Sequence, residues 1–279
     1  TGVAFDKMGN SSTTVHHEDG TTETIHAKFI IDSSGWGRVL PRILDLDKPS
    51  KLPRHSSIFT HVKDELRPAG FEGCRISFDI LDKDTWLWII PFSNGITSVG
   101  VVGGTTFFNG LVGTNTQVLR ELLARFDRSR DRFATTDFLF EPVILKNVAQ
   151  SVKQTHGKGF ALTGNSAEFL DPVFSSGVTF ATESGLLAAK LIAKELNGGA
   201  IDWQKDYSDY ISRGVDVFAT YVKEWYSGNL QKLFFAPNVN ADIKRQICAV
   251  LAGYVWDETN PFVTKHDRVV KALAHVISL

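Results

Sequence analysis

The sequence has few sulfur-containing residues and almost no net charge. Its 279 residues include two cysteines and one methionine, and 30 Lys and Arg stand against 31 Asp and Glu. Cys74 and Cys248 are too few to make a disulfide framework, so we expect reduced thiols in a cytoplasmic protein. The charge balance excludes a general attraction to nucleic acid or to an anionic membrane surface.

Long apolar runs are also missing. No stretch reaches the roughly 20 apolar residues that a membrane-spanning helix needs, and the opening TGVAFDKMGN lacks the apolar segment of a signal peptide. The chain does not begin with Met, which suggests a fragment. Its length is nevertheless enough to bury a large core, as one big or two modest domains.

Strand patterns occupy the first part of the chain. Residues 13–32 read as a β-hairpin turning at Asp19-Gly20, whose second arm runs into a mostly buried strand, KFIID. The strand ends in the small-residue loop of SSGWGRVLPR. Residues 56–104 alternate like an antiparallel sheet, with CRISFDIL, TWLWIIP and a hairpin at Asn94-Gly95.

Helical patterns follow. NTQVLRELLARF carries one apolar stripe and can be capped by Asn115 or Thr116. FEPVILKNVAQSVKQ looks like further strand. A second helix runs from about Val178 to Leu196 and ends at Asn197-Gly198-Gly199. Everything after Asp202 has a helical period.

The segment GNSAEFLDPVFSSGV, from Gly164 to Val178, lies between an apolar strand and that second helix. The first amide N–H groups of a helix lack intrahelical partners and carry partial positive charge, which suits an anion. Small residues recur along the helix at four-residue intervals, which would let another backbone approach closely: Gly177, Ala181, Gly185, Ala189 and Ala193. The alternative interpretation is a helix capped by Ser175 or Ser176.

The same segment resembles the flavin-contacting loop of the flavin-dependent halogenases and their relatives among the aromatic hydroxylases. WLWIIP, Trp86 to Pro91, is similar to the Trp-x-Trp-x-Ile-Pro signature of those halogenases, and AKFIIDSSGWGRVLPR resembles another segment of their FAD domain. WYSGNLQKLFF and LAGYVWDETNPF are similar to the C-terminal helices of phenol- and pyrrole-type halogenases. The resemblance covers about Lys28 to Phe262.

The resemblance implies FAD as the cofactor, reduced by a separate flavin reductase or by NAD(P)H. It implies that the cofactor-binding residues are Ser34, Gly35, Gly164, Asn165, Pro172, Ser175, Ser176, Gly177 and Val178. The amides at Ser176 and Gly177 would also hold a halide ion. Asn165 stands where the family usually has Asp, and an amide can still hydrogen-bond a hydroxyl group.

The resemblance further implies that Trp86, Trp88 and Pro91 separate the flavin from the substrate, so that oxidised halide, and not the flavin itself, reaches the organic molecule. The alternative for WLWIIP is ordinary sheet core. Phe174 stands where the tryptophan-type enzymes carry glutamate. The expected substrate is therefore an electron-rich phenol or pyrrole, free or tethered to a carrier protein.

Two family features are missing from the sequence. The lysine that activates hypohalous acid would lie upstream of it, so no catalytic residue is assigned, and no Gly-x-Gly-x-x-Gly opens a βαβ unit. The chain as given is expected to bind FAD poorly and to be inactive alone. His16, His17 and His26 are expected to be solvated, and no metal site is predicted.

The predicted fold class is α+β, or α/β in its nucleotide-binding part. Residues 1–55 are expected to form part of an FAD-binding domain of the aromatic hydroxylase type, and residues 56–150 an antiparallel sheet substrate domain. Residues 151–200 would return to the FAD-binding domain as strand, loop and helix, and residues 201–279 would form a C-terminal helical region. Two alternative functions stay open: an FAD-dependent monooxygenase or dehydrogenase of the same fold that uses no halide, and a non-catalytic module that binds an apolar ligand.

Overall fold

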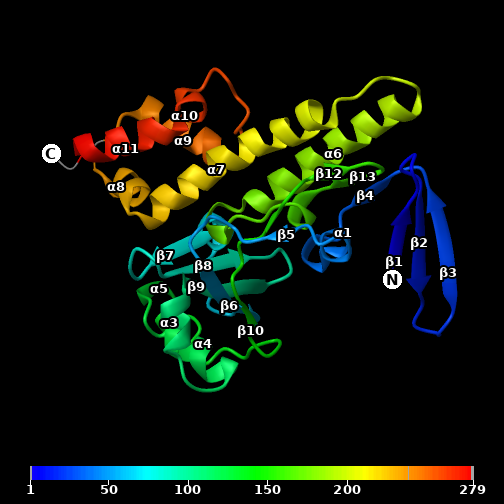
Figure 1. Cartoon of the computed structure of the whole chain (residues 1–279). Coiled ribbons are helices and arrows are strands. Elements are labelled where there is room, and N and C mark those ends of the chain that lie inside the picture. Colours follow the sequence, from blue (N-terminus) through cyan, green and yellow to red (C-terminus); the bar gives the residue numbers. More distant parts are fainter. Residues whose placement is uncertain (1, 238, 278–279) are drawn as a thin grey trace. The chain divides into compact units, whose positions relative to one another are not determined.

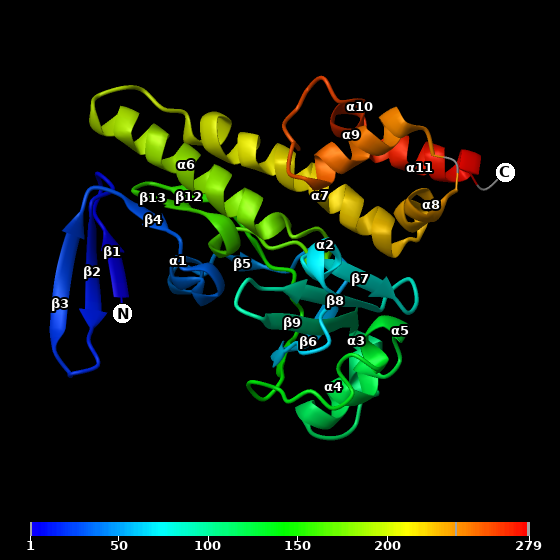
Figure 2. The same ribbon diagram turned by 180° about the vertical axis from the view of Figure 1, so that it is seen from behind.

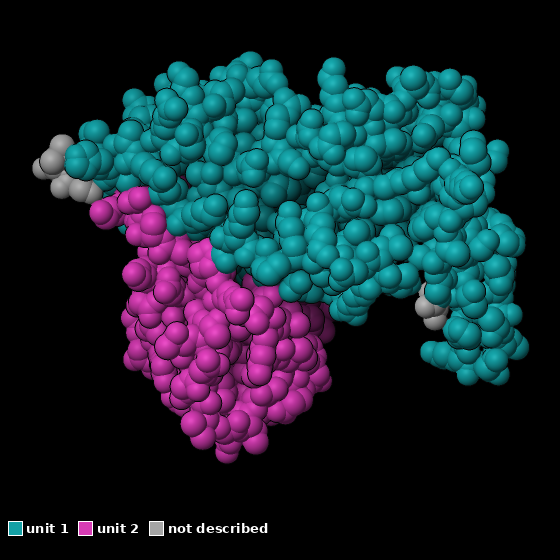
Figure 3. Space-filling view, viewed as in Figure 1, with its two compact units in different colours: residues 1–52, 149–224, 233–279 teal, residues 53–148, 225–232 magenta. Residues whose placement is uncertain are grey.

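The computed structural model describes residues 2–237 and 239–277. The chain divides into two compact units (Figure 3). Unit 1 comprises residues 1–52, 149–224 and 233–279, and unit 2 comprises residues 53–148 and 225–232. Helices and antiparallel sheets occur together, which confirms an α+β fold.

Unit 1 begins with a three-stranded antiparallel meander in the order β1-β2-β3, formed by β1 (Gly2–Phe5), β2 (Ser11–His16) and β3 (Thr22–Ala27). The predicted hairpin at Asp19-Gly20 is confirmed, but its turn is longer than two residues. Only Gly20 has a positive φ there, of 85°, and the backbone N–H of His17 donates to the carbonyl of Thr21 at 2.9 Å.

A second sheet of unit 1 has the order β12-β13-β4, with β12 (His156–Gly157), β13 (Phe160–Leu162) and β4 (Ile30–Asp32). β4 and β13 are parallel, with Ile31 opposite Ala161. The prediction that KFIID is mostly buried is wrong for Ile31, which is 38% exposed. β4 is the edge strand of this sheet among the described residues, and Ile31 lines an open groove of about 440 Å³ together with Val39 and Ile43.

Short elements connect these strands to the rest of unit 1. A 3₁₀ turn, η1 (Gly35–Gly37), and helix α1 (Val39–Ile43) follow β4, and β5 (Asp47–Lys48) pairs with β11 (Ser151–Val152). The segment after β13 contains two further 3₁₀ turns, η2 (Gly164–Ser166) and η3 (Pro172–Phe174). FEPVILKNVAQSVKQ contributes only two short strands, β10 (Val143–Leu145) and β11.

The helices predicted for the second half of the chain are present. They are α6 (Ser176–Leu196), the π-helical η4 (Gln204–Asp209), α7 (Tyr210–Tyr226), α8 (Asn229–Phe235), α9 (Ala241–Leu251), α10 (Pro261–Thr264) and α11 (His266–Ile277). In both views α6 and α7 run side by side (Figures 1 and 2), and the rings of Phe180 and Phe218 meet edge to face at 5.4 Å. No described helix is long and apolar enough to cross a membrane.

The buried face of α6 differs from the predicted one. It consists of Ser176, Phe180, Ser184 and Ala188, one position away from the ridge of small residues. Ala181 touches the loop after β13, but a Cβ placed on Gly185 would meet no atom within 4 Å, and Ala189 is exposed. The face is chosen by the aromatic contacts of Phe180, because small side chains bury little apolar area.

Unit 2 is built on a five-stranded antiparallel sheet in the order β10-β6-β9-β8-β7. Its strands are β6 (His55–Lys63), β7 (Ser77–Ile80), β8 (Trp86–Pro91), β9 (Ile96–Gly104) and β10 (Val143–Leu145). Gly95 turns the predicted hairpin between β8 and β9 with a φ of 84°. Four short helices complete this stretch of chain: α2 (Gly70–Gly73), α3 (Thr105–Asn109), α4 (Asn115–Leu123) and α5 (Asp127–Arg130).

The hydrophobic core of unit 2 lies between one face of this sheet and α4. Ile58, Leu87 and Val101 from the sheet, all fully buried, pack with Leu119 and Leu122 of α4. The cap of α4 is Thr114, one residue before the predicted Asn115 or Thr116. Thr114 and Gln117 form a reciprocal capping box. Alternation along β6 and β8 places Phe59 and Trp88 on the opposite face of the sheet, 6.0 Å apart between ring centres.

Candidate functional site

Two strand ends of unit 1 meet where the small-residue loops begin. Because β4 and β13 are parallel, their carboxyl ends lie at the same edge of the sheet. The backbone N–H of Thr163 donates to the carbonyl of Asp32 at 2.9 Å, and the hydroxyl groups of Ser33 and Thr163 lie 2.7 Å apart. The loop from Ser33 and the loop from Gly164 therefore run beside each other.

Asp32 organises the first of these loops. Its side chain is buried, 5% exposed, and one carboxylate oxygen accepts hydrogen bonds from the backbone N–H of Ser34 at 2.8 Å and from the hydroxyl of Ser166 at 3.0 Å. The other oxygen accepts from the backbone N–H of Leu40 at 2.7 Å. A buried carboxylate with three donors holds the turn after β4 in one shape.

Ser166 joins the two loops. Its hydroxyl accepts a hydrogen bond from the backbone N–H of Gly35 at 3.0 Å while it donates to Asp32, and the Ser34 hydroxyl lies 3.3 Å away. Two of the predicted cofactor residues, Ser34 and Gly35, are thereby tied to the segment that holds two others, Gly164 and Asn165. Sequence reasoning missed both Asp32 and Ser166, although a polar residue ending an apolar strand is a usable signal.

Arg38 binds backbone carbonyls of the loop that begins at Gly164. It is 3% exposed and has a left-handed φ of 44°, which is uncommon for a residue with a side chain. Its guanidinium donates to the carbonyls of Asn165 at 3.0 Å, Ser166 at 3.3 Å and Ser151 at 2.9 Å, and it pairs with Asp47. Arg38 was also missed from the sequence, because its three carbonyl partners lie more than 100 residues away along the chain.

Gly164 sets how closely the second loop approaches α6. It has a φ of 52°, and a Cβ there would lie 3.0 Å from the Cβ of Ala181. Its backbone N–H donates to the hydroxyl of Ser184 at 3.0 Å. This contact fixes the loop against the first turns of α6, where small residues are required on both sides.

The beginning of α6 lies beside Asn165. A Cβ placed on Gly177 would lie 3.7 Å from the side-chain oxygen of Asn165 and 3.5 Å from the ring of Phe169. The N-cap Ser175 has a left-handed φ of 52° and makes no side-chain cap hydrogen bond. The expected serine therefore stands at the N-cap position of α6, but it does not cap the helix with its side chain. Val178 in the first turn is 73% exposed.

The approach to α6 is stiffened by Asp171 and Pro172. Pro172 occupies the first position of η3, where its fixed φ is favourable. The carboxylate of Asp171 accepts a hydrogen bond from the backbone N–H of Val173 at 3.0 Å.

An exposed aromatic ring lies near the same loop. Trp36 is 44% exposed, and its ring lies 4.9 Å from that of Phe169. The loop thus presents exposed aromatic surface close to the amide groups of a helix end.

Glu168 is the titratable group of this loop. Burial raises its pKa to about 7, against the opposing effects of a hydrogen bond from the Ser151 hydroxyl and of the nearby Lys48 and Arg38. The Ser151 hydroxyl lies 2.8 Å from the carboxylate. The carboxyl group of Glu168 therefore changes its charge near neutral pH.

The three predicted barrier residues belong to unit 2. Trp86 is 4% exposed, and its indole N–H donates to the hydroxyl of Tyr226 at 3.1 Å. Trp88 is half-buried; its indole N–H donates to the Ser98 hydroxyl at 3.1 Å, and its ring lies over Gly100. Pro91 is the last residue of β8 and lies beyond the part of the strand that pairs with β7.

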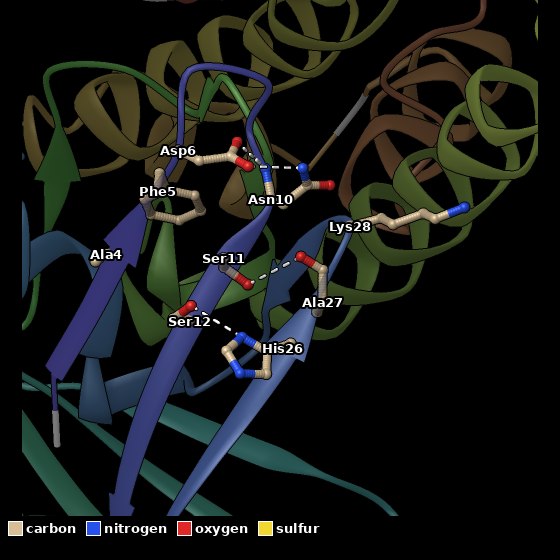
Figure 4. A pocket seen from close by; sticks show the side chains of 9 residues that line it. All are labelled: Ala4, Phe5, Asp6, Asn10, Ser11, Ser12, His26, Ala27 and Lys28. Carbon is tan, nitrogen blue, oxygen red and sulfur yellow. Dashed lines mark hydrogen bonds between the residues drawn. The ribbon is translucent and has the colours of Figure 1, made fainter.

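A groove on the meander and the cysteines are the other features considered. Figure 4 shows an open groove of about 500 Å³ on the meander, in which Asp6 is bound to Asn10 and the His26 ring nitrogen lies 2.9 Å from the Ser12 hydroxyl. Five of its polar side chains already bond to other residues of the meander: Asp6, Asn10, Ser11, Ser12 and His26. Within the described residues, no three His, Cys, Asp or Glu side chains are placed to hold a metal ion. Cys74 and Cys248 are both exposed free thiols.

Comparison with known proteins assigns the class. Residues 1–255 match the model of the tryptophan halogenase family. The chain therefore belongs to this family, and flavin-dependent halogenases are among the proteins similar to it.

Individual relatives are similar over most of the chain. A 1H-pyrrole-2-carbonyl-[peptidyl-carrier protein] brominase of Pseudoalteromonas luteoviolacea is 22% identical over 250 residues, which are 87% of this chain and 60% of the relative. The corresponding chlorinase of Pseudomonas fluorescens is 24% identical over 83% of this chain and 53% of its own length. The chain thus spans between half and three fifths of these two relatives.

Solved structures show the same fold. A flavoprotein/dehydrogenase from Cytophaga hutchinsonii is 46% identical, with a TM-score of 0.96. The matched region is 100% of this chain and 68% of the flavoprotein chain. The flavin-dependent brominase Bmp2 is 21% identical with a TM-score of 0.84, over 99% of this chain and 69% of its own. The halogenase PltM, with a TM-score of 0.68, was solved in complex with phloroglucinol and FAD.

Proposed function

We propose that this chain is part of an FAD-dependent halogenase that modifies an electron-rich aromatic compound, a phenol or a pyrrole. The cofactor would supply the oxidising chemistry when bound, and the residues described here would bind and orient it. Family membership supports flavin chemistry, and the pyrrole halogenases among the relatives support the substrate class. These relatives act on a pyrrole held by a carrier protein, so a carrier-tethered substrate is part of the proposal.

The single structural observation that carries the proposal is the meeting of the two strand-end loops with the start of α6, whose N-cap Ser175 makes no side-chain cap hydrogen bond. Ser34 and Gly35 are tied to the Gly164–Ser166 turn, and Asn165 lies beside Gly177. Reduction places negative charge on the pyrimidine edge of a flavin, and the first amides of a helix, which lack intrahelical partners, suit that charge. The residues present therefore fit FAD at Ser34, Gly35, Gly164, Asn165, Pro172 and Ser175–Val178. Halide at Ser176 and Gly177 belongs to the same proposal.

The functional division of the chain follows from this assignment. Residues 1–55 and 151–200 would belong to the FAD-binding domain, residues 56–150 to the substrate domain and residues 201–279 to a helical region. The parallel pairing of β4 with β13 supports the first part, because it joins two of these segments in one sheet. A separate flavin reductase would supply reduced FAD.

A second function is favoured by a specific observation. The structure with 46% identity is named a flavoprotein/dehydrogenase, which supports an FAD-dependent oxidoreductase that uses no halide. Use of halide separates this alternative from the preferred function.

The test is expression of the complete gene that encodes this chain, followed by a flavin absorption spectrum and turnover assays. We expect bound FAD, and brominated product from phenols or pyrroles only when bromide, oxygen and a flavin reductase are all supplied. Bound FAD that gives hydroxylated or dehydrogenated product alone would replace the halogenase by the second function. A colourless protein that binds apolar ligands would remove both.

A further inference from the structure

The two tryptophans of WLWIIP are held in different ways inside unit 2. The ring of Trp88 lies over Gly100, and its N–H bonds to Ser98 on the neighbouring strand β9. All of these contacts come from the sheet itself. Trp86 is buried, and its N–H bonds to the hydroxyl of Tyr226, which is 140 residues away in sequence at the end of α7. The position of Trp86 thus depends on a residue outside the sheet.

Tyr226 is itself fixed by a histidine. It is 5% exposed, and its ring stacks on that of His55 with centres 3.7 Å apart and planes 17° apart. His55 is 2% exposed, and burial lowers its pKa, which favours the neutral ring. The first residue of β6 therefore supports Tyr226, and Tyr226 supports the first residue of β8.

We propose that Tyr226 is the positioning residue for the Trp86–Trp88 pair, and that its hydroxyl group keeps the aromatic barrier of unit 2 in its working arrangement. The barrier role of the two tryptophans rests on the proposed function. The claim that Tyr226 orients Trp86 rests only on the hydrogen bond between them. The two indole rings lie 6.1 Å apart with planes inclined by 51°. If Trp86 rotates so that its N–H meets another acceptor, its ring will displace that of Trp88, because the two rings are neighbours on the same face of the sheet.

Burial makes this hydrogen bond decisive for the orientation. A buried indole N–H without an acceptor costs about 1–3 kcal/mol, so Trp86 is expected to turn when the hydroxyl is removed. Tyr226→Phe removes one oxygen atom and keeps the stacking ring over His55. Its matched control is Tyr221→Phe, which deletes the hydroxyl of a fully buried tyrosine in the same helix, where it bonds to the carbonyl of Phe262 at 3.1 Å. Tyr221 has no assigned part in the barrier.

The first measurement needs no activity. In this chain labelled with ¹⁵N-tryptophan, Trp86→Phe identifies the indole N–H signal of Trp86. We expect Tyr226→Phe to shift that signal and to speed its hydrogen exchange at least tenfold, while Tyr221→Phe leaves it in place. An unchanged Trp86 signal in Tyr226→Phe overturns the inference, whatever the enzyme assays give.

The second measurement uses the complete enzyme with FAD, flavin reductase, bromide and an accepted aromatic substrate. We expect Tyr226→Phe to lower the halogenated product formed per NADH consumed by threefold or more, with hydrogen peroxide as the remainder, and Tyr221→Phe to keep the wild-type ratio. In a Trp86→Phe background, Tyr226→Phe should change the ratio no further. A shifted indole signal with an unchanged ratio overturns the positioning role.

The two proposals fail in different ways. If the wild-type enzyme makes no halogenated product with any phenol or pyrrole, the proposed function is lost. The indole signal then still decides whether Tyr226 holds Trp86. If halogenation is found and both tyrosine variants lower the product ratio equally, the loss reflects general loosening and the positioning role is rejected.

Discussion

The strand-end loops of unit 1 and the sheet face of unit 2 are held in place by different forces. In unit 1 the loop shape follows from hydrogen bonds to three buried polar side chains, Asp32, Arg38 and Ser166. In unit 2 the tryptophan pair rests on a sheet whose opposite face packs into an apolar core. Hydrogen bonds have strict geometry and fix individual atoms, whereas apolar packing fixes volumes. For the stability of the fold, loss of a single polar atom should therefore matter most in unit 1, and gain of an atom most in unit 2.

The largest effect is expected from Asp32→Ala. It leaves the N–H groups of Ser34 and Leu40 and the Ser166 hydroxyl without their acceptor, and we expect the free energy of unfolding to fall by about 4 kcal/mol. Urea unfolding measures the change. The control is Asp19→Ala, which removes an exposed aspartate with a similar local bond to Thr21. An equal loss in the two variants would show that burial does not distinguish these carboxylates.

In unit 2, Gly100→Ala adds one carbon atom where there is no room. The new methyl group would lie 2.3 Å from the ring of Trp88 and 2.6 Å from the Cβ of Phe59. We expect a loss of about 3 kcal/mol in stability, together with a change in tryptophan fluorescence as Trp88 moves.

The matched control for this variant is Gly104→Ala, at the end of the same strand. The nearest atom to a methyl group there is the Asp84 carboxylate oxygen, at 4.0 Å. This variant should change the stability by less than about 0.5 kcal/mol. If Gly100→Ala is tolerated equally well, the sheet face is less tightly packed than the contacts indicate.

A smaller effect is expected from Ser166→Ala. It removes the acceptor of the Gly35 N–H and the link between the two loops, and we expect about 1–2 kcal/mol of lost stability. If the loops bind FAD as proposed, the Kd for FAD in the complete enzyme should rise several-fold more than it does for Ser12→Ala, which removes a serine on the meander. An unchanged Kd for FAD would show that the Ser166 link between the two loops plays no part in cofactor binding.

The last prediction concerns the pH dependence of stability, for which only an upper limit follows from the structure. The pKa of Glu168 is raised to about 7 in the folded chain, from an ordinary value of 4.5. The folded state therefore keeps a proton that the unfolded state has lost, and stability falls as pH rises from 4.5 through 7. The fall is at most about 3 kcal/mol. Glu168→Gln should flatten this part of the pH profile of Tm. If Glu168→Gln keeps the wild-type slope of Tm against pH, other groups cause the pH dependence.

The sequence was sufficient where a feature depends on neighbours along the chain. The hairpin of β2 and β3, the turn at Asn94-Gly95, the alternation of WLWIIP and the amphipathic helices were all predicted, because β and helical periods and turn residues are local signals. Errors of one position, such as Thr114 in place of Asn115 as the cap of α4, are typical of element ends.

Long-range partners could not be predicted. Arg38 bonds to backbone atoms more than 100 residues away, and the apolar period of α6 did not reveal which side would be buried. The expected serine does stand at the N-cap of α6, but its positive φ and the missing side-chain bond could not be read from the sequence.

By itself, the sequence determined the order of strands and helices, the small-residue loops after β4 and β13, and the motifs that place the chain in its family. Only the tertiary structure decided that Asp32, Ser166 and Arg38 join those loops, and that Tyr226 reaches the N–H of Trp86. The physical reason is that each buried polar atom must find a partner. Chain folding brings these partners together from distant parts of the sequence.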